Sequence, residues 1–195
     1  RGHHAFGAEF DPNAPIKLIE FGALSCSHCA EFSEAATAEI RDNFVNSGRV
    51  SFELRLHMNN ALDVPAALLA TCGATEAVIP LSDQFWGWQK TMFTTLQQNQ
   101  ALFQSAETMK PEQRFATIAK AAGMDQFFAS RGVAAGQAST CLADAAKATA
   151  LVAATDKAAR DMQVTGTPTF FINGTKLEVN TWPTVKAELE KAGAR

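Results

Sequence analysis

The chain has 195 residues, of which 47% are hydrophobic and 19% charged, with a formal net charge of −3. This composition excludes an intrinsically disordered chain, and the near balance of 17 basic and 20 acidic residues gives no broad basic surface for nucleic acid. No apolar run reaches the roughly 18 residues that a membrane-spanning helix needs. The length fits one domain, with or without a sizeable insertion, that buries a core without metal or disulfide staples.

The first residues, RGHHAFGAEF, lack the apolar core of a secretory signal, and Arg1 is not a translation start. We therefore expect either a processed protein or a recombinant fragment, either of which can have lost an export signal. Residues 1–13 are interpreted as a leader that is disordered or derived from a tag. His3 and His4 within it are assigned no role.

Two strands with a helix between them are predicted near the N-terminus. IKLIEFGAL (16–24) is a short β-rich run that ends near a glycine, and VSFELRLHM (50–58) alternates apolar and polar residues. Between them, apolar residues recur every four positions and predict a helix from Cys29 to about Val45: Phe32, Ala36, Ile40 and Phe44. Strand, helix and strand with short joints indicate a βαβ unit with a right-handed parallel crossover.

The middle of the chain predicts a bundle of short helices. Residues 61–141 are rich in alanine and glutamine at helical spacing and are broken at glycines and prolines: Gly73, Pro80, Pro111, Gly123 and Gly132. The aromatic residues of DQFWGWQKTMFTTLQQ (83–98) are expected in the core of this block: Phe85, Trp86, Trp88 and Phe93.

The C-terminal part returns to mixed α and β character. A longer helix is predicted over 142–162, followed by TGTPTFFINGTKLEV (165–179), whose two strand-like runs join through Asn173 and Gly174 as a hairpin. WPTVKAELEKAG then predicts an amphipathic helix that begins near Thr181 or Pro183.

Cys26 and Cys29, in LSCSHCAEF, are the first candidate functional residues. Cys26 is expected at a helix N-terminus, where free backbone N–H groups and the helix dipole favour a thiolate. Cys29, one turn further, can form a disulfide with Cys26 but is more shielded, an asymmetry that suits thiol–disulfide exchange. His28 between them can add positive charge or a hydrogen bond to the thiolate, which would stabilise the reduced form and make the disulfide an oxidant.

Two structural alternatives for this pair are weaker. A C-x-x-C pair can be half of a zinc site, but no second such pair exists, and Cys72 and Cys141 stand alone in the helical block. A structural disulfide between Cys26 and Cys29 would close too small a loop to stabilise the fold much. We therefore expect redox chemistry at this pair and no structural metal.

The second signal is Pro168, which precedes a predicted strand, where a cis proline would make a tight, fixed corner. Together, EFGALSCSHCAEF and TGTPTFFING resemble a thioredoxin-fold protein. With DQFWGWQKTMFTTLQQ and the segment from STCLADAAKATALV to Pro168, the chain is similar to DsbA-like thiol:disulfide oxidoreductases over about residues 14–190. The resemblance implies an α/β thioredoxin fold (14–60 and 142–195) interrupted by an inserted α-helical domain (61–141).

The resemblance also implies roles for individual residues. Thr167 and Pro168 would lie beside Cys26, where the backbone of Thr167 binds an extended substrate segment. Ser27 and His28 stand where the best-known members often have Pro-His, the dipeptide that tunes the thiolate and borders the substrate. Glu20 would lie under the site and pass protons to and from Cys29, the alternative being a carboxylate that faces water.

Two further side-chain predictions concern cysteine and histidine. In an oxidising compartment, Cys72 and Cys141 are expected to form a structural disulfide, the alternative being two buried free thiols. His57 is interpreted as a surface or hinge residue at the end of a strand.

Taken together, these features predict a monomeric, exported oxidoreductase, located in a bacterial periplasm, that donates its Cys26–Cys29 disulfide to reduced or unfolded proteins. It would need no organic cofactor, because its own sulfurs carry the electrons. The resemblance to the DsbA-like family implies a membrane protein as its reoxidising or reducing partner. The alternatives are a reductase or isomerase of the same fold, a Cu(I)-type metal carrier that uses Cys26 and Cys29, and a peptide-binding chaperone.

Overall fold

The computed structural model describes residues 7–194, so His3 and His4 lie outside the described residues. A five-stranded mixed sheet has the order β1-β3-β2-β4-β5. The strands are β1 (Gly7–Phe10), β2 (Ile16–Gly22), β3 (Val50–Leu56), β4 (Thr169–Ile172) and β5 (Thr175–Lys176). β2 and β3 are parallel, as the predicted βαβ unit requires, whereas β1 runs antiparallel to β3 and β4 antiparallel to β2.

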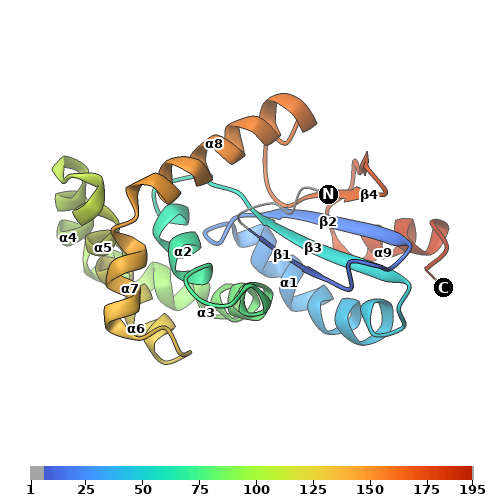
Figure 1. The fold of residues 1–195 in the computed structure, drawn as a ribbon, viewed down its shortest axis with the longest axis horizontal. Coiled ribbons are helices and arrows are strands. Elements are labelled where there is room, and N and C mark those ends of the chain that lie inside the picture. Colours follow the sequence, from blue (N-terminus) through green and yellow to red (C-terminus); the bar gives the residue numbers. More distant parts are fainter. Residues whose placement is uncertain (1–6, 195) are drawn as a thin grey trace.

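The two faces of the sheet are covered by different helices, because strand side chains alternate between faces. α1 (Ser27–Glu39) and α9 (Trp182–Lys191) pack on one face, where Phe32 of α1 contacts Phe170 of β4. α8 (Ala145–Met162) covers the other, where Phe21 and Phe171 pack with Ala158. Figure 1 shows α8 and α1 on opposite sides of the sheet.

Several element boundaries differ from the sequence prediction. The interpretation of residues 1–13 as a leader without a fold is wrong for 7–10, which form β1 by pairing with the edge of β3. The helix expected to continue to Val45 changes at Ile40 into a π-helical segment, η1 (Ile40–Val45). α8 begins at Ala145 rather than 142, because the side chain of Asp144 caps it by accepting a hydrogen bond from the N–H of Lys147.

The hairpin after Pro168 is shorter than KLEV suggested, since β5 ends at Lys176. Asn173 and Gly174, the predicted turn residues, both have positive φ, the backbone conformation that glycine and asparagine tolerate best. The last helix begins as predicted, with Thr181 as its N-cap residue.

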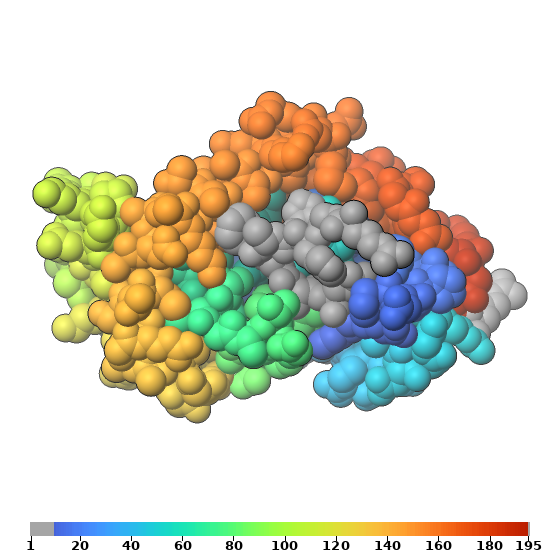
Figure 2. All heavy atoms as spheres, in the orientation of Figure 1, coloured from blue at the N-terminus to red at the C-terminus, as the bar shows by residue number. Residues whose placement is uncertain are grey.

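The residues between the two halves of the sheet form the predicted helical block. Its helices are α2 (Asp63–Ala70), α3 (Val78–Gln98), α4 (Gln100–Ser105), α5 (Pro111–Ala122), α6 (Met124–Ala129) and α7 (Ala135–Leu142). Short 3₁₀ turns, η2 (Thr75–Ala77) and η3 (Ala106–Thr108), lie between some of them. Figure 2 shows this block, coloured green to yellow, at one end of the molecule and α9, in red, at the other.

The aromatic residues of α3 only partly match the expectation of a core. Phe85 and Trp86 are buried, and Phe85 packs against both Phe127 and Phe128 of α6. Trp88 is partly buried and stacks on Phe127. Phe93 was expected in the core but is exposed, because it lies on the solvent side of the same helix.

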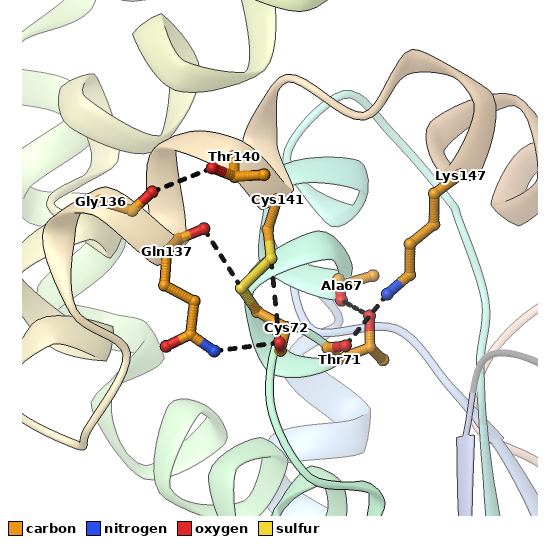
Figure 3. The surroundings of a disulfide bond; sticks show 8 residues. All are labelled: Ala67, Thr71, Cys72, Gly136, Gln137, Thr140, Cys141 and Lys147. Atoms are coloured by element: carbon orange, nitrogen blue, oxygen red, sulfur yellow. Dashed lines mark hydrogen bonds between the residues drawn. A yellow bond between two sulfur atoms is a disulfide. The ribbon is translucent and has the colours of Figure 1, made fainter.

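A disulfide joins Cys72, just after α2, to Cys141 in α7, as the sequence analysis expected. Figure 3 shows the polar contacts around it, in which Gln137 Nε2 donates to the carbonyl of Cys72. Lys147 of α8 donates to the neighbouring carbonyl of Thr71. The disulfide therefore links the end of α2 to α7, next to the carbonyl of Thr71 that Lys147 of α8 binds.

Candidate active site

Cys26 is the N-cap residue of α1, directly after the loop that leaves β2. Its Sγ accepts a hydrogen bond of 3.3 Å from the backbone N–H of Cys29. Both cysteines are free thiols in this structure, but Cys26 is partly exposed whereas Cys29 is fully buried. The outer sulfur is therefore the one that a second protein can reach.

The two thiols have opposite pKa shifts. The pKa of Cys26 is lowered to about 6, first by a hydrogen bond from the Cys29 side chain, then by the Thr167 side chain and by the backbone N–H groups of Cys29 and His28. Burial opposes this shift. The pKa of Cys29 is raised, mainly because burial disfavours its charged form and then because its hydrogen bond to Cys26 requires the proton. At neutral pH, the reduced pair therefore carries one thiolate, on Cys26.

The loop that contains Pro168 lies against Cys26. The Thr167–Pro168 peptide bond is cis, as the sequence analysis expected. In its protonated form, the Cys26 thiol donates to the carbonyl oxygen of Thr167 at 3.4 Å. Pro168 is buried and Thr167 is partly exposed, so the segment before β4 offers a backbone edge beside the reactive sulfur.

Glu20 lies on β2, on the same face of the sheet as α1, opposite Phe170 in the β2–β4 register. Its side chain is only 2% exposed, so the alternative of a water-facing carboxylate is wrong. Oε1 has no hydrogen-bond partner among the described residues. Burial raises the pKa of Glu20 well above its usual value, with further contributions from the negative charges of Asp83 and Cys26.

A partly buried carboxyl group, that of Asp83 on α3, interacts electrostatically with Glu20. Asp83 Oδ1 accepts hydrogen bonds from the hydroxyls of Ser33 at 3.0 Å and Thr37 at 3.1 Å, both on α1. Burial raises the pKa of Asp83 to about 6, although these two hydrogen bonds oppose the shift. The sequence analysis missed Asp83, because nothing in the pattern of α3 distinguishes it from a surface acid.

Ser27 and His28 are exposed on the first turn of α1. The His28 ring contacts a carboxylate, with Nδ1 3.3 Å from Glu31 Oε2, instead of supporting the Cys26 sulfur as expected. His28 lowers the pKa of Cys26 through its backbone N–H. The ring is therefore available at the surface beside the site.

The loop between β2 and α1, residues 23–26, is called the cysteine loop here. The residues that hold it in place were not predicted from the sequence. Gln89 of α3 is buried and donates to the carbonyls of Leu24 at 2.7 Å and Cys26 at 3.1 Å. Trp86, one turn earlier, donates from Nε1 to the carbonyl of Ala23 at 3.0 Å. These bonds satisfy backbone carbonyls just before α1. They therefore fix the position of the backbone that leads to Cys26.

Asp63, at the start of α2, is completely buried and holds three backbone N–H groups. Oδ1 accepts from Ser25 at 2.8 Å, and Oδ2 accepts from Asn59 at 2.9 Å and Asn60 at 3.1 Å. Burial raises the pKa of Asp63, and the three hydrogen bonds counteract this. The signal that could have found Asp63 is a single acid within the apolar run ALDVPAALLA.

The interpretation of His57 as a surface residue is wrong, since its side chain is only 5% exposed. The ring lies edge-on to Phe21, with centroids 6.3 Å apart. Its backbone N–H donates to the carbonyl of Gly22, which keeps the chain in sheet register beyond the end of β3. Burial lowers the pKa of His57.

Two negative findings concern other kinds of site. Within residues 7–194, no group of three or more histidine, cysteine or acidic side chains is arranged to hold a metal ion. Over the same range, none of the helices has the length and apolar character needed to cross a membrane.

Comparison with known proteins identifies the family. The family model described as thioredoxin matches residues 3–191. The chain therefore belongs to the thioredoxin family.

A Rickettsia conorii protein provisionally named a protein-disulfide oxidoreductase is 22% identical over 178 residues, which are 91% of this chain and 56% of the relative. A similarly named protein of Rickettsia bellii is 20% identical, and the match covers 61% of its length. The chain thus spans less than two thirds of these curated relatives.

Solved structures match over nearly the whole chain. A protein-disulfide isomerase from Novosphingobium aromaticivorans is 26% identical, with a TM-score of 0.86 over 94% of this chain and 97% of the other. Wolbachia pipientis alpha-DsbA1 is 17% identical, with a TM-score of 0.75 over 97% and 92% of the two chains. The fold is accordingly the DsbA-like one, a thioredoxin-like sheet with an inserted helical region.

Proposed function

We propose that this protein is a thiol–disulfide oxidoreductase that donates its Cys26–Cys29 disulfide to reduced, exported proteins. The observation that carries this proposal is the asymmetry of the two sulfurs: a partly exposed Cys26 with a pKa lowered to about 6, and a fully buried Cys29 with a raised pKa. A stabilised thiolate favours the reduced form of the pair, so the corresponding disulfide is an oxidant.

The reaction transfers two electrons in two exchange steps. A substrate thiolate attacks Cys26 Sγ of the oxidised protein, the Cys26–Cys29 bond breaks, and a mixed disulfide forms with Cys26. A second substrate thiolate then attacks the substrate sulfur of that mixed disulfide, and Cys26 leaves as a thiolate. The substrate gains a disulfide, and the protein is left with two reduced cysteines.

In the first step, Glu20 is proposed to supply the proton that Cys29 needs when it leaves. A buried Cys29 thiolate is strongly disfavoured, as its raised pKa indicates. The raised pKa of Glu20 keeps its carboxyl group protonated closer to neutral pH than an exposed acid, and its Oε1 is not engaged by the described residues. When the protein is reoxidised, the same group takes the proton back from Cys29.

The proposed substrate site is the backbone edge beside Cys26. The carbonyl of Thr167 is within hydrogen-bonding distance of Cys26 Sγ, so an extended substrate segment that pairs with this edge would bring its own cysteine to the sulfur. Pro168 fixes the edge, and the exposed Ser27 and His28 border it. The proposed partners are reduced or unfolded proteins and a membrane protein that reoxidises or reduces the pair, and the proposed location is the periplasm.

The deciding experiment is equilibration of the Cys26–Cys29 pair with a glutathione redox buffer, combined with oxidation of a reduced, unfolded substrate. A reduction potential near that of DsbA, about −120 mV, together with substrate oxidation, supports a disulfide donor. A value near that of thioredoxin, about −270 mV, contradicts the donor proposal and favours a reductase or isomerase. The similarity to the protein-disulfide isomerase of Novosphingobium aromaticivorans supports the isomerase alternative.

One variant and one binding measurement separate this proposal from functions of other classes. Cys26→Ser removes the attacked sulfur and is expected to abolish substrate oxidation. If Cys26→Ser still prevents a substrate protein from aggregating as well as the native protein does, a peptide-binding chaperone is favoured. Binding of one Cu(I) without any disulfide formation would favour a metal carrier instead.

A further inference from the structure

An exposed asparagine connects the chain after β3 to the loop that contains Pro168. Asn59 Nδ2 donates a hydrogen bond of 2.8 Å to the hydroxyl oxygen of Thr167. The two residues are 108 positions apart in sequence and meet because β3 ends and β4 begins at the edge of the sheet where β2 leads into α1. This contact lies directly next to Cys26, whose sulfur contacts the Thr167 carbonyl.

Asn59 is held in place on its backbone side. Its N–H donates to Asp63 Oδ2 at 2.9 Å, and the preceding N–H, of Met58, donates to the hydroxyl of Thr155 on α8 at 2.9 Å. Asp63 also binds the N–H of Ser25. The position of the Asn59 side chain is therefore fixed relative to both the cysteine loop and α8.

The direction of this hydrogen bond determines what the Thr167 hydroxyl can do. A threonine hydroxyl has one hydrogen to donate and two lone pairs that accept. Because Asn59 Nδ2 occupies a lone pair, the hydrogen of Thr167 remains available to another acceptor. The sulfur of Cys26 lies 3.4 Å from the carbonyl oxygen of the same residue, so the Cys26 thiolate is the charged acceptor beside Thr167. The lowered pKa of Cys26, to which the Thr167 side chain contributes, agrees with this placement.

We propose that Asn59 is a positioning residue that turns the hydroxyl hydrogen of Thr167 toward Cys26 and so stabilises the thiolate. The side chain of Asn59 bonds to Thr167 and not to the sulfur. It acts through Thr167, and it is itself oriented by Asp63. The inference deepens the proposed function, since the same thiolate is the leaving group in the second exchange step.

The test is a titration of the Cys26 thiolate in the reduced protein, followed by its ultraviolet absorbance. Asn59→Ala removes the donor, and we expect the pKa of Cys26 to rise by about half a unit to one unit, the effect of one weakened hydrogen bond to a charged group. Asn59→Asp can only accept, so it competes with Cys26 for the Thr167 hydrogen. It is expected to raise the pKa further.

Asn60 supplies matched controls, because its side chain is also exposed but donates to Ser25 Oγ instead of Thr167. Asn60→Ala and Asn60→Asp are expected to shift the pKa of Cys26 much less than the corresponding Asn59 variants. If Asn60→Asp and Asn59→Asp raise it equally, the effect is that of an added negative charge, and the proposal is overturned.

A double-mutant cycle with Thr167→Val tests the route of the effect. Valine keeps the shape of the side chain without the hydroxyl, so Asn59→Ala should cause no further shift in a Thr167→Val protein. An undiminished shift there, or no shift in the single Asn59→Ala variant, overturns the proposal. The titration needs no substrate, so its outcome is independent of whether the protein oxidises other proteins.

Discussion

Asp63 Oδ1 accepts a hydrogen bond of 2.8 Å from the backbone N–H of Ser25, the residue before Cys26. The acceptor lies at the start of α2, in the helical block, and the donor lies in the loop between β2 and α1. The cysteine loop is therefore shaped by a side chain from a distant part of the sequence. Its stability should depend on that side chain.

Asp63→Ala is expected to lower the free energy of unfolding by about 2–4 kcal/mol, because it leaves up to three backbone N–H groups without their acceptor. Urea denaturation measures this. Asp63→Asn is the matched variant: it keeps one oxygen acceptor and should lose less. Equal losses for the two variants would mean that the carboxylate charge, which both substitutions remove, matters more than the number of hydrogen bonds.

The pH dependence of Cys26 reactivity is the second prediction. In the reduced protein, the rate of alkylation of Cys26 is expected to rise through a pH of about 6 and to be nearly constant by neutral pH, whereas an ordinary cysteine has its midpoint near about 8.5. Mass spectrometry of the alkylated protein identifies the modified residue. A midpoint near that of an ordinary cysteine would contradict the stabilised thiolate.

The same shift links the stability of the reduced protein to pH. The pKa of Cys26 is lower in the folded protein than its ordinary value of 9.0, so the unfolded chain binds more protons between about pH 6 and 9. The reduced protein should therefore become more stable relative to the oxidised protein as pH rises from about 6 to 8, and lose this advantage as pH falls. Nearer pH 9 the raised pKa of Cys29 opposes the gain. Urea unfolding of the reduced and the oxidised protein at each pH gives the difference between their free energies of unfolding. Titratable groups that reduction does not affect contribute equally to both forms and largely cancel.

The fourth prediction concerns the disulfide between Cys72 and Cys141, which closes a loop with a sequence separation of 69. The double variant Cys72→Ala/Cys141→Ala should lower the free energy of unfolding by about 4 kcal/mol, because the unfolded chain regains the freedom that the bond removed. Calorimetric or urea unfolding of the two proteins, each with Cys26 and Cys29 reduced, is the comparison. An unchanged unfolding midpoint would contradict a stabilising role.

The sequence predicts those parts of the fold that have strong local patterns. Alternation in VSFELRLHM and the four-residue repeat that includes Phe32 and Ala36 correspond to β3 and α1. β1 was missed because a strand of four residues owes its structure to its partner β3. η1 was missed because an apolar repeat does not distinguish an α-helix from a π-helix at its end.

The same distinction holds at the candidate site. Cys26, Cys29 and Pro168 have local signals, a C-x-x-C pair and a proline before a strand. Asp63 and Gln89 act on the cysteine loop from the helical block, across 38 and 63 or more positions. Their contacts exist only once the chain is folded, so no spacing rule could identify them.

The last prediction concerns Glu20, whose carboxyl group is buried with one oxygen unpartnered among the described residues. Glu20→Gln keeps the size of the side chain but cannot deliver a proton to Cys29. We expect it to slow the reaction of the oxidised protein with a small dithiol by at least about tenfold, since a positioned acid or base usually contributes more than that. Single-turnover quenching with alkylation measures the rate.

Glu34→Gln is the matched control, because it makes the same substitution at an exposed acid on α1 that has no proposed part in the proton transfer. If both variants slow the reaction equally, the effect is electrostatic and Glu20 has no special role. The pH dependence of unfolding also distinguishes the two variants. Because the pKa of Glu20 is raised in the folded protein, this group stabilises the folded protein at acidic pH, and the contribution is lost as pH rises through the raised pKa. Glu20→Gln should remove that part of the pH dependence of unfolding, whereas Glu34→Gln should leave it unchanged.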